Sequence, residues 1–369
     1  MKTSSAVFSN AFASVESGFN HFQTVTHDHS SRLAAISAVD IEVDTTGQHL
    51  RSLLARRNGL APISLLPPEI LWRVFHLLAL DEAPFSSKEN SGWIRTTHVC
   101  RHWRQVALDD SSLWARISRI GSELDSSLIS EMLDRARNAP LEIDIDFLIT
   151  NAKPDSLHLF LPHLSHTRVL RLHMKKPDCE GVREIFSREA PALEHFELGF
   201  SAGYPITLQG LGGTSFKGQA QKLRSFCISQ VCVPWSLIPR GQLTQLKIIL
   251  ITGTSHAGPS SFGNARQFID LLVNCPALEI LVLELCLPSD LSQFTQDRTV
   301  HLPHLSRLCV GDSSSDVMNL LKMLKLPSTT TLHLRCVSDI GSSHNDYHIL
   351  PFVSAQFPTS VPVEYKVSK

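Results

Sequence analysis

Hydrophobic and polar residues follow two different periods along the chain, and each period predicts a different kind of secondary structure. Between Ile63 and Ile117, apolar residues recur at intervals of three or four positions, which predicts short amphipathic helices. From Leu141 onward, short alternating runs are separated by turn-forming residues, which predicts strands. This change of period predicts an α+β chain with more than one domain in its 369 residues.

The first helix of this region is expected to begin at Pro67 and Pro68. Proline is tolerated in the first turn of a helix and stops a helix that arrives from upstream. Glu69 stands in the same turn, where a carboxylate meets unpaired backbone N–H groups. The apolar residues that follow have helical spacing and form one wide stripe: Ile70, Leu71, Val74, Phe75, Leu77 and Leu78.

A second helix and a short third turn are predicted after a polar loop at 81–92. The second helix places apolar residues on one face: Val99, Cys100, Trp103, Val106 and Ala107. Asp109 or Asp110 is expected to cap the last turn, which carries Leu113, Trp114 and Ile117. A unit of about 55 residues with so many large apolar side chains buries a small core and leaves an apolar patch exposed.

Residues 61–118 resemble the F-box, a helical module that docks a protein onto the Skp-type adaptor of a cullin-based ubiquitin ligase. The motifs that carry the resemblance are, in order, Leu66-Pro67-Pro68-Glu69-Ile70-Leu71, Val99-Cys100-Arg101, Trp103 and Leu113-Trp114. They are similar to the F-box-like versions found in large families of mushroom-forming fungi. The resemblance implies a non-catalytic receptor subunit that binds the adaptor, and through it a cullin. The residues it assigns to adaptor binding are Leu66, Pro67, Pro68, Glu69, Ile70, Leu71, Val74, Phe75, Val99, Cys100, Trp103, Leu113 and Trp114.

The second half of the chain repeats one apolar pattern, L-x-x-L-x-L, at starts about 27 residues apart, within the ~20–29 window of leucine-rich repeats. Full copies begin at Leu193, Leu223, Leu243, Leu278 and Leu305, and weaker copies begin at Thr167 and Thr329. Helical patterns at 180–190, 262–274 and 316–325 separate several copies. The resemblance to leucine-rich repeats implies a degenerate α/β solenoid with a parallel sheet over 151–337. A helix at 128–136 and an alternating strand at 141–149 connect it to the helical module, within 119–150.

A leucine-rich solenoid presents to its partners the strand residues that flank the buried leucines. Because side chains alternate along a strand, these residues are expected on one face. They form the predicted client surface: Arg171, His173, His195, Glu197, Gln245, Lys247, Glu284, Arg307, His333 and Arg335. Any single one of them is better explained as a solvated strand residue, so the prediction concerns the group.

Composition narrows the range of functions. A hydrophobic content of 43% with 19% charged residues is typical of a soluble, core-forming protein. A formal charge of −1 gives no basic surface for non-specific nucleic-acid binding, and no run approaches the ~18 apolar residues of a membrane-spanning helix. The eight cysteines include no CxxC pair, which argues against a zinc module and favours a reducing compartment, the cytoplasm or the nucleus. No cofactor or metal is expected.

The two ends of the chain are predicted to have little regular structure. Residues 1–30 are rich in Ser, Thr, His and Asn, and we expect them to be disordered. Residues 31–60 have a weak helical pattern that Gly47 interrupts, which predicts a short helix or a broken coiled-coil segment. Residues 338–369 contain three prolines and are expected to form an irregular tail.

Two other functions remain open. The chain could be a scaffold that binds the adaptor without assembling a ligase. It could also be a serine hydrolase, because Gly311-Asp312-Ser313 resembles the nucleophile block of one class of lipases and Asp339, His344 and His348 lie downstream. The triplet follows the sixth repeat strand in register, which favours a turn.

Overall fold

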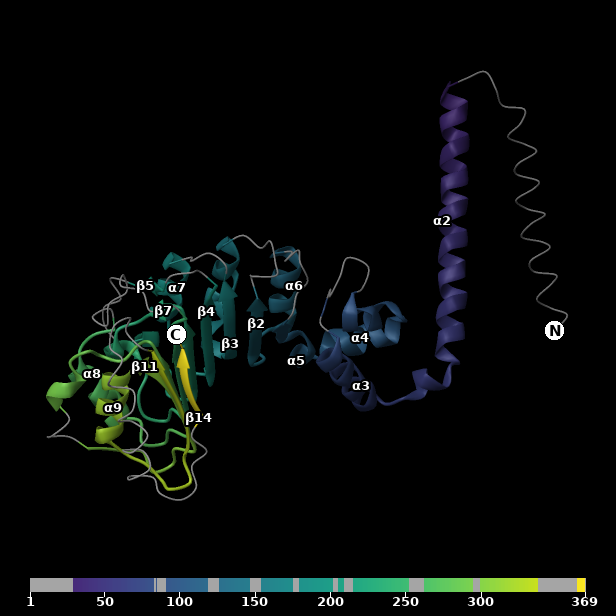
Figure 1. The fold of residues 1–369 in the computed structure, drawn as a ribbon. Helices are drawn as coiled ribbons and strands as arrows, with labels where there is room; N and C mark the ends of the chain where they lie inside the picture. The colour runs from purple at the N-terminus through teal and green to yellow at the C-terminus, as the bar shows by residue number, and fades with distance from the viewer. Residues whose placement is uncertain are drawn as a thin grey trace. The chain divides into compact units, whose positions relative to one another are not determined.

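Figure 1 shows the computed structural model, which describes residues 29–82, 84, 91–118, 126–146, 154–174, 179–201, 205–208, 215–251, 262–294, 299–337 and 364–368. Contacts within the chain define two compact units, Met1–Leu71 with Thr97–Arg104, and Trp72–Thr96 with Gln105–Lys369. Of the predicted disordered tail, residues 1–28 lie outside the described part of the chain.

The first unit contains α2 (His29–Gly59), a helix of 31 residues. The prediction that Gly47 interrupts this segment is wrong, because the helix continues through Gly47. Its carbonyl accepts a hydrogen bond of 3.0 Å from Arg51 Nε. A glycine costs about 1 kcal/mol relative to alanine inside a helix, which is too little to break a long one. The 3-10 helix η1 (Pro62–Leu65) follows, and the hydroxyl of Ser64 donates to the Asn58 carbonyl at 2.6 Å.

After η1, the described residues of the helical region predicted at 61–118 form four more short helices. They are α3 (Pro68–Asp81), the 3-10 helix η2 (Gly92–His98), α4 (Arg101–Asp109) and α5 (Ser111–Trp114). The periodicity of the sequence did not predict η2. The expectation that Val99 and Cys100 lie inside the second helix is also wrong. The Cys100 carbonyl accepts the first helical hydrogen bond, from the N–H of Arg104 at 3.0 Å, so α4 begins after it.

Ten parallel strands form one sheet in the second unit, and their order in the sheet is their order in the chain (Figure 1). They are β1 (Arg116–Ser118), β2 (Leu141–Asp146), β3 (Thr167–Met174), β4 (His195–Phe200), β6 (Ser225–Ser229), β8 (Gln245–Ile249), β9 (Ile280–Glu284), β11 (Arg307–Ser313), β13 (Thr331–Val337) and β14 (Glu364–Ser368). The predicted order of helices followed by a large parallel sheet is therefore confirmed. Whether the repeats belong to the leucine-rich family stays a prediction.

Helices and short 3-10 segments connect successive strands. The α-helices are α6 (Ser126–Ala136), α7 (Cys179–Phe186), α8 (Ala265–Val273) and α9 (Ser314–Met323). The 3-10 segments are η3 (Pro154–Leu159), η4 (Leu161–His166), η5 (Ser215–Gly218), η6 (Trp235–Leu237) and η8 (Leu291–Phe294). Two small parallel pairs join some connections, β5 (Ile206–Thr207) with β7 (Val231–Cys232), and β10 (Val300–His301) with β12 (Leu324–Lys325).

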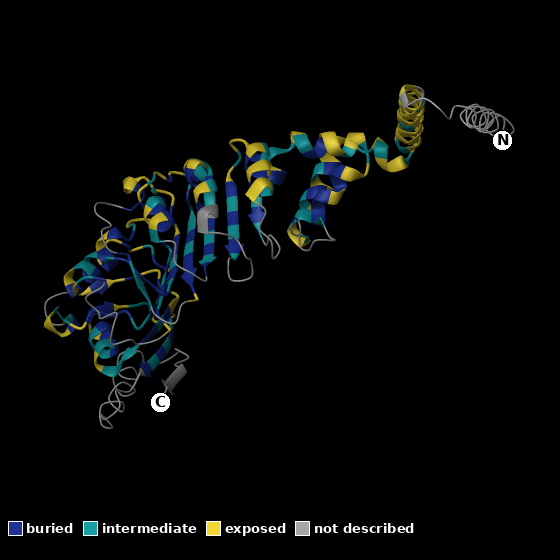
Figure 2. Cartoon of the chain, turned by 90° about the horizontal axis from the view of Figure 1, so that it is seen from above, coloured by how far each residue is buried: buried dark blue, intermediate teal, exposed yellow. Residues whose placement is uncertain are grey.

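The repeated apolar positions form the core beneath the sheet. In β2, for example, Leu141, Ile143 and Ile145 are buried while the residues between them are half-buried, and Figure 2 shows this alternation in blue and teal. The same alternation holds for the later copies of the pattern, so each strand buries one side against the connecting segments. Where threonine replaces the first leucine, its hydroxyl donates to a backbone carbonyl, as in Thr167 to His163 at 2.8 Å.

Three predicted details are corrected by the structure. The last repeat begins at Thr330, not Thr329, because Thr330 is buried and its hydroxyl donates to the Leu305 carbonyl at 2.6 Å. The predicted irregular tail includes β14, which pairs with β13, while 338–363 lie outside the described residues. The sheet also starts earlier than predicted, at β1, immediately after α5.

A cluster of four phenylalanines packs where β4 and β6 meet α7 and η5. The ring of Phe196 lies 5.4 Å from the rings of Phe186, Phe216 and Phe226. We expect Phe196→Ala to lower the free energy of unfolding by about 3–5 kcal/mol, because it leaves a cavity among three rings. Urea unfolding followed by tryptophan fluorescence measures this, and Phe196→Leu should cost less. A loss below about 1 kcal/mol for the alanine variant would contradict this packing.

Candidate functional site

Polar contacts join α3 to α4 and to Asp110, which lies between α4 and α5. His76 Nε2 lies 2.8 Å from Asp110 Oδ2, and the indole N–H of Trp72 donates to the Val106 carbonyl at 3.2 Å. Asp110 also caps α5, because its Oδ1 accepts from the backbone N–H of Ser112 at 3.1 Å. Of the two predicted caps, Asp110 is therefore the one that the structure uses.

Trp114 holds the core of this helical region. Its indole N–H donates to the Ala107 carbonyl at 2.7 Å, and its ring meets Trp93 edge to face at 4.9 Å. The guanidinium carbon of Arg135, on α6, lies 4.3 Å from the centre of the Trp114 ring. Only 1% of Trp114 is exposed, so its side chain has no surface left for a partner.

The predicted adaptor-binding residues therefore separate into three groups by burial. Four of them, Leu71, Phe75, Leu113 and Trp114, are buried and stabilise the helices that present the surface. Their contact with the adaptor stays a prediction. Leu66, Cys100 and Trp103 are half-buried, and the exposed members are Pro67, Pro68, Glu69, Ile70, Val74 and Val99.

Cys100 has a local structural role that accounts for its place in the motif. Its sulfur accepts the backbone N–H of Trp103 at 3.5 Å, which is the position of a weak cap at the start of α4. Sulfur is a poor acceptor, but it meets an N–H group that has no partner inside the helix. Val99 precedes the cap and is 52% exposed.

The outer face of α3 carries an uncovered apolar stripe. Ile70, Val74 and Leu77 follow one another at helical spacing and are 41%, 37% and 63% exposed. We call these three residues the docking stripe. Leu77 was recognised as part of the apolar helix but not as a site residue, because periodicity alone does not tell which part of a broad stripe faces inward.

One family model matches this region of the chain. Residues 63–120 match the F-box-like family. The chain thus contains an F-box-like domain, which indicates an adaptor role in ubiquitin ligase complexes. F-box domains generally bind Skp-type adaptors, and proteins that contain them are typically non-catalytic substrate receptors. No curated protein and no solved structure gives a significant match to the chain.

All ten predicted client-surface residues lie on one face of the sheet, in three rows that follow the strand register. The first row is His195, Ser225, Gln245, Ile280, Arg307 and Thr331. The second row is Asp144, Arg171, Glu197, Cys227, Lys247, Val282, Cys309 and His333. The third row is Asp146, His173, Gly199, Ser229, Ile249, Glu284, Gly311 and Arg335. We call these rows the sheet face. Their common side is confirmed, while client binding stays a prediction.

Ion pairs cross the strands at both ends of the sheet face. On β3, Arg171 lies between two carboxylates, 3.7 Å from Asp144 and 3.6 Å from Glu197. His173 Nε2 lies 3.5 Å from Glu197 Oε1. Toward the other end, Arg335 Nη2 lies 2.5 Å from Glu284 Oε2, although β11 separates their strands.

Two glycines make room for these long side chains. Gly311 lies between Glu284 and Arg335 in register, and a Cβ at this position would stand 3.1 Å from Arg335 Nε. A Cβ at Gly199 would stand 2.8 Å from His173 Nδ1. Glycine within a strand is the signal that sequence reading missed here, since it marks a position that another group approaches closely.

Between the two ion-pair groups, the sheet face combines the cations Lys247 and Arg307 with uncharged side chains. Burial raises the pKa of Cys227 and of Cys309, so both are neutral thiols at physiological pH. The half-buried side chains of Ile249, Ile280 and Val282 lie in the same part of the rows. Ion pairs thus flank a centre of apolar side chains, neutral thiols and two cations, which suits binding and not acid–base chemistry.

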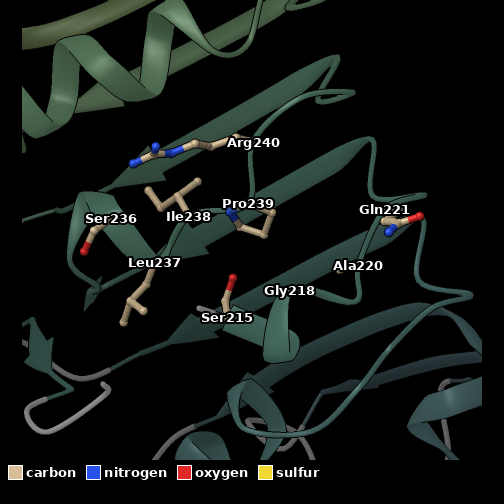
Figure 3. Close-up of a pocket in the computed structure, with 9 residues that line it drawn as sticks. All are labelled: Ser215, Gly218, Ala220, Gln221, Ser236, Leu237, Ile238, Pro239 and Arg240. Carbon is tan, nitrogen blue, oxygen red and sulfur yellow. The ribbon is translucent and has the colours of Figure 1, made fainter. Parts of the chain in front are cut away.

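An open pocket of about 450 Å³ lies on the connections between strands (Figure 3). Its lining residues are Ser215, Gly218, Ala220, Gln221, Ser236, Leu237, Ile238, Pro239 and Arg240. They come from η5 and η6 and the residues after them, and none belongs to the sheet face. The lining contains one cation, Arg240, and the hydroxyl and amide groups of serine and glutamine residues. It contains no carboxylate, histidine or cysteine, so we assign the pocket no chemical role.

Ser313, the candidate nucleophile, caps a helix. Its Oγ accepts the backbone N–H of Asp316 at 3.2 Å, at the start of α9, and donates to Asp316 Oδ2 at 2.6 Å. Helix capping accounts for this serine. The downstream residues Asp339, His344 and His348 lie outside the described residues. No helix in the described part of the chain is long and apolar enough to cross a membrane.

The His173–Glu197 contact leads to a prediction about pH. Its hydrogen bond raises the pKa of His173 and lowers the pKa of Glu197. The histidine's contribution to stability is complete below its unfolded pKa and is lost as pH rises through the folded pKa. The carboxylate's contribution is present above its unfolded pKa and is lost as pH falls. We therefore expect the pair to stabilise the fold most between their ordinary pKa values, 4.5 and 6.5.

NMR titration of the histidine ring tests this expectation. The pKa of His173 should lie above 6.5 and should fall in Glu197→Gln, because partial burial then acts without its partner. His195 is the internal control, since burial and Arg171 hold its pKa below 6.5 in the native protein. An unchanged pKa of His173 in the variant would show that the contact does not form in solution.

Proposed function

We propose that this chain is a substrate-recognition subunit of a Skp–cullin–F-box ubiquitin ligase, of the type found in fungi. The F-box-like domain binds a Skp-type adaptor, and the adaptor links the chain to a cullin. A leucine-rich-repeat-type sheet face holds the client protein, in the cytoplasm or the nucleus. Transfer of ubiquitin is then accelerated by proximity, because tethering makes an intermolecular reaction effectively intramolecular.

One observation carries the proposal: the docking stripe stays uncovered within the region that matches the F-box-like family. Ile70, Val74 and Leu77 give α3 an apolar face, while its other side buries Leu71 and Phe75. A monomeric protein keeps such a face only at a cost in solubility, which an apolar groove on a partner removes. The adaptor is the partner that F-box domains generally bind.

The double variant Val74→Asp/Leu77→Asp tests the docking stripe. We expect each charge at the interface to cost at least ~2 kcal/mol, about a 30-fold loss of affinity. Titration calorimetry or pull-down of the full chain with a Skp-type adaptor measures this. Val273→Asp is the matched control, because Val273 is an exposed valine (52%) on α8 and should not affect adaptor binding.

The variant Trp114→Ala distinguishes a loss of stability from a loss of the adaptor-binding surface. Removal of this buried ring should lower the free energy of unfolding by about 3–5 kcal/mol, and adaptor binding should fall only as far as the folded population falls.

Full adaptor affinity in Val74→Asp/Leu77→Asp, in a protein with native circular dichroism, would rule out the docking stripe.

The sheet face is tested by charge reversal at Lys247 and Arg307, which lie on neighbouring rows. With the proteasome blocked, proximity labelling should recover client proteins with the native chain. The Lys247→Glu/Arg307→Glu variant should lose them while it keeps the adaptor. A client list identical to that of the native chain would overturn the assignment of this face.

The second hypothesis is that the chain is a scaffold that binds the adaptor without assembling a ligase. Co-purification of a cullin distinguishes the ligase subunit from the scaffold. A ligase subunit should co-purify with cullin as well as adaptor, and clients should accumulate in cells that lack the chain. Recovery of the adaptor alone, with no protein accumulating, would favour the scaffold.

A further inference from the structure

The helix α2 exposes its apolar side chains along its whole length, and Figure 2 shows it mostly in yellow. Eight large apolar residues of α2 are each at least 40% exposed: Leu33, Ile36, Val39, Ile41, Val43, Leu50, Leu53 and Leu54. Helices in proteins gain most of their stability from packing an apolar face. A row of this kind therefore indicates a binding partner.

Six positions of α2 follow the heptad spacing of a coiled coil. Ile36, Val43 and Leu50 are seven residues apart and occupy one core position. Val39, Thr46 and Leu53 have the same spacing, three residues later, and occupy the other core position. Arg32 and Arg57 take the next places of the pattern and mark its limits. The apolar seam from Ile36 to Leu53 is about 27 Å long.

This seam is symmetric about its centre, so a second copy fits it in the antiparallel direction. When two copies of α2 are superposed head to tail, Ile36 of one faces Leu53 of the other, and Val39 faces Leu50. The central layers pair Val43 with Thr46. The flanking residues Leu33 and Leu54 also meet across the two helices, because they occupy the same heptad position. Of the eight exposed residues, only Ile41 points away from the seam.

The charges of α2 favour the same direction. Acidic residues lie beside the first half of the seam, at Asp40, Glu42 and Asp44. Basic residues lie beside and just after its second half, at His49, Arg51 and Arg56. Antiparallel helices bring the acidic half of one copy to the basic half of the other. Parallel helices would place like charges side by side, which is unfavourable.

We propose that α2 pairs with α2 of a second copy of this chain as an antiparallel two-helix coiled coil, so that the protein is a homodimer. The inference goes beyond the proposed ligase role and does not depend on it. The dimer would carry two docking stripes and two sheet faces. A client with two binding sites would then be held more tightly than by either copy alone.

Co-expression of two full-length copies with different tags tests the dimer. Both copies should also carry Val74→Asp/Leu77→Asp, so that a shared adaptor cannot bridge them. We expect each copy to co-purify the other, and Val43→Asp/Leu50→Asp to reduce the recovered partner at least tenfold. Ile41→Asp is the matched control, because Ile41 and Val43 are both 62% exposed but only Val43 lies in the seam.

Sedimentation equilibrium of the purified full chain should give a dimer that dissociates on dilution. Circular dichroism should show equal helix content in Ile41→Asp and Val43→Asp, so that a lost dimer is not a lost helix. A monomer at every accessible concentration, or equal effects of Ile41→Asp and Val43→Asp/Leu50→Asp, would overturn the proposal.

Oxidative cross-linking tests the direction. A mixture of Ile36→Cys and Leu53→Cys chains should form a cross-linked heterodimer, whereas each variant alone should stay at the level of the native chain. The native chain is the necessary blank, because it has eight cysteines of its own. Cross-linking of Ile36→Cys with itself would show parallel helices and overturn the antiparallel arrangement.

Discussion

The packing of Trp114 joins the helices to the sheet, and the second unit depends on it. The ring contacts Trp93 from η2 and Arg135 from α6, and its N–H donates to the Ala107 carbonyl of α4. Two residues later β1 begins. A stack of parallel strands in chain order leaves its first strand open on one side, and such arrays need a cap. Here α5 packs against both β1 and α6, so the last helix of the F-box-like domain shares a core with the edge of the sheet.

The face of each strand was predictable because strand geometry leaves little choice. Side chains alternate, and in L-x-x-L-x-L the buried leucines determine where their neighbours point. All ten client-surface residues therefore lie on the expected side. The pairing of Arg335 with Glu284 was not predictable from period alone, because it depends on Gly311 in the strand between them. That contact requires the order of strands in the sheet, which a single strand pattern does not contain.

The orientation of α3 was less predictable for a physical reason. Its polar residues Glu69, Arg73 and His76 form only a narrow face, and apolar residues cover the rest of its circumference, so the pattern does not show which part of the apolar stripe is buried. The inner side is determined by tertiary contacts, such as those of Trp72 with Val106 and of His76 with Asp110, which lie more than 30 residues later in the chain. The motif that identifies the domain thus mixes two kinds of residues. Leu113 and Trp114 are buried in its core, whereas Ile70, Val74 and Leu77 are exposed.

The sheet face has ion pairs at both ends, and its centre combines half-buried apolar side chains with the cations Lys247 and Arg307. The end charges are already paired with one another, and half-exposed ion pairs contribute at most about 1 kcal/mol each. A client that relied on Arg171 or Arg335 would have to replace Glu197 or Glu284, with little net gain. Half-buried Ile249, Ile280 and Val282 lose contact with water when covered and break no existing pair. Affinity for a client is therefore expected to come from the centre, while the paired charges at both ends select its orientation.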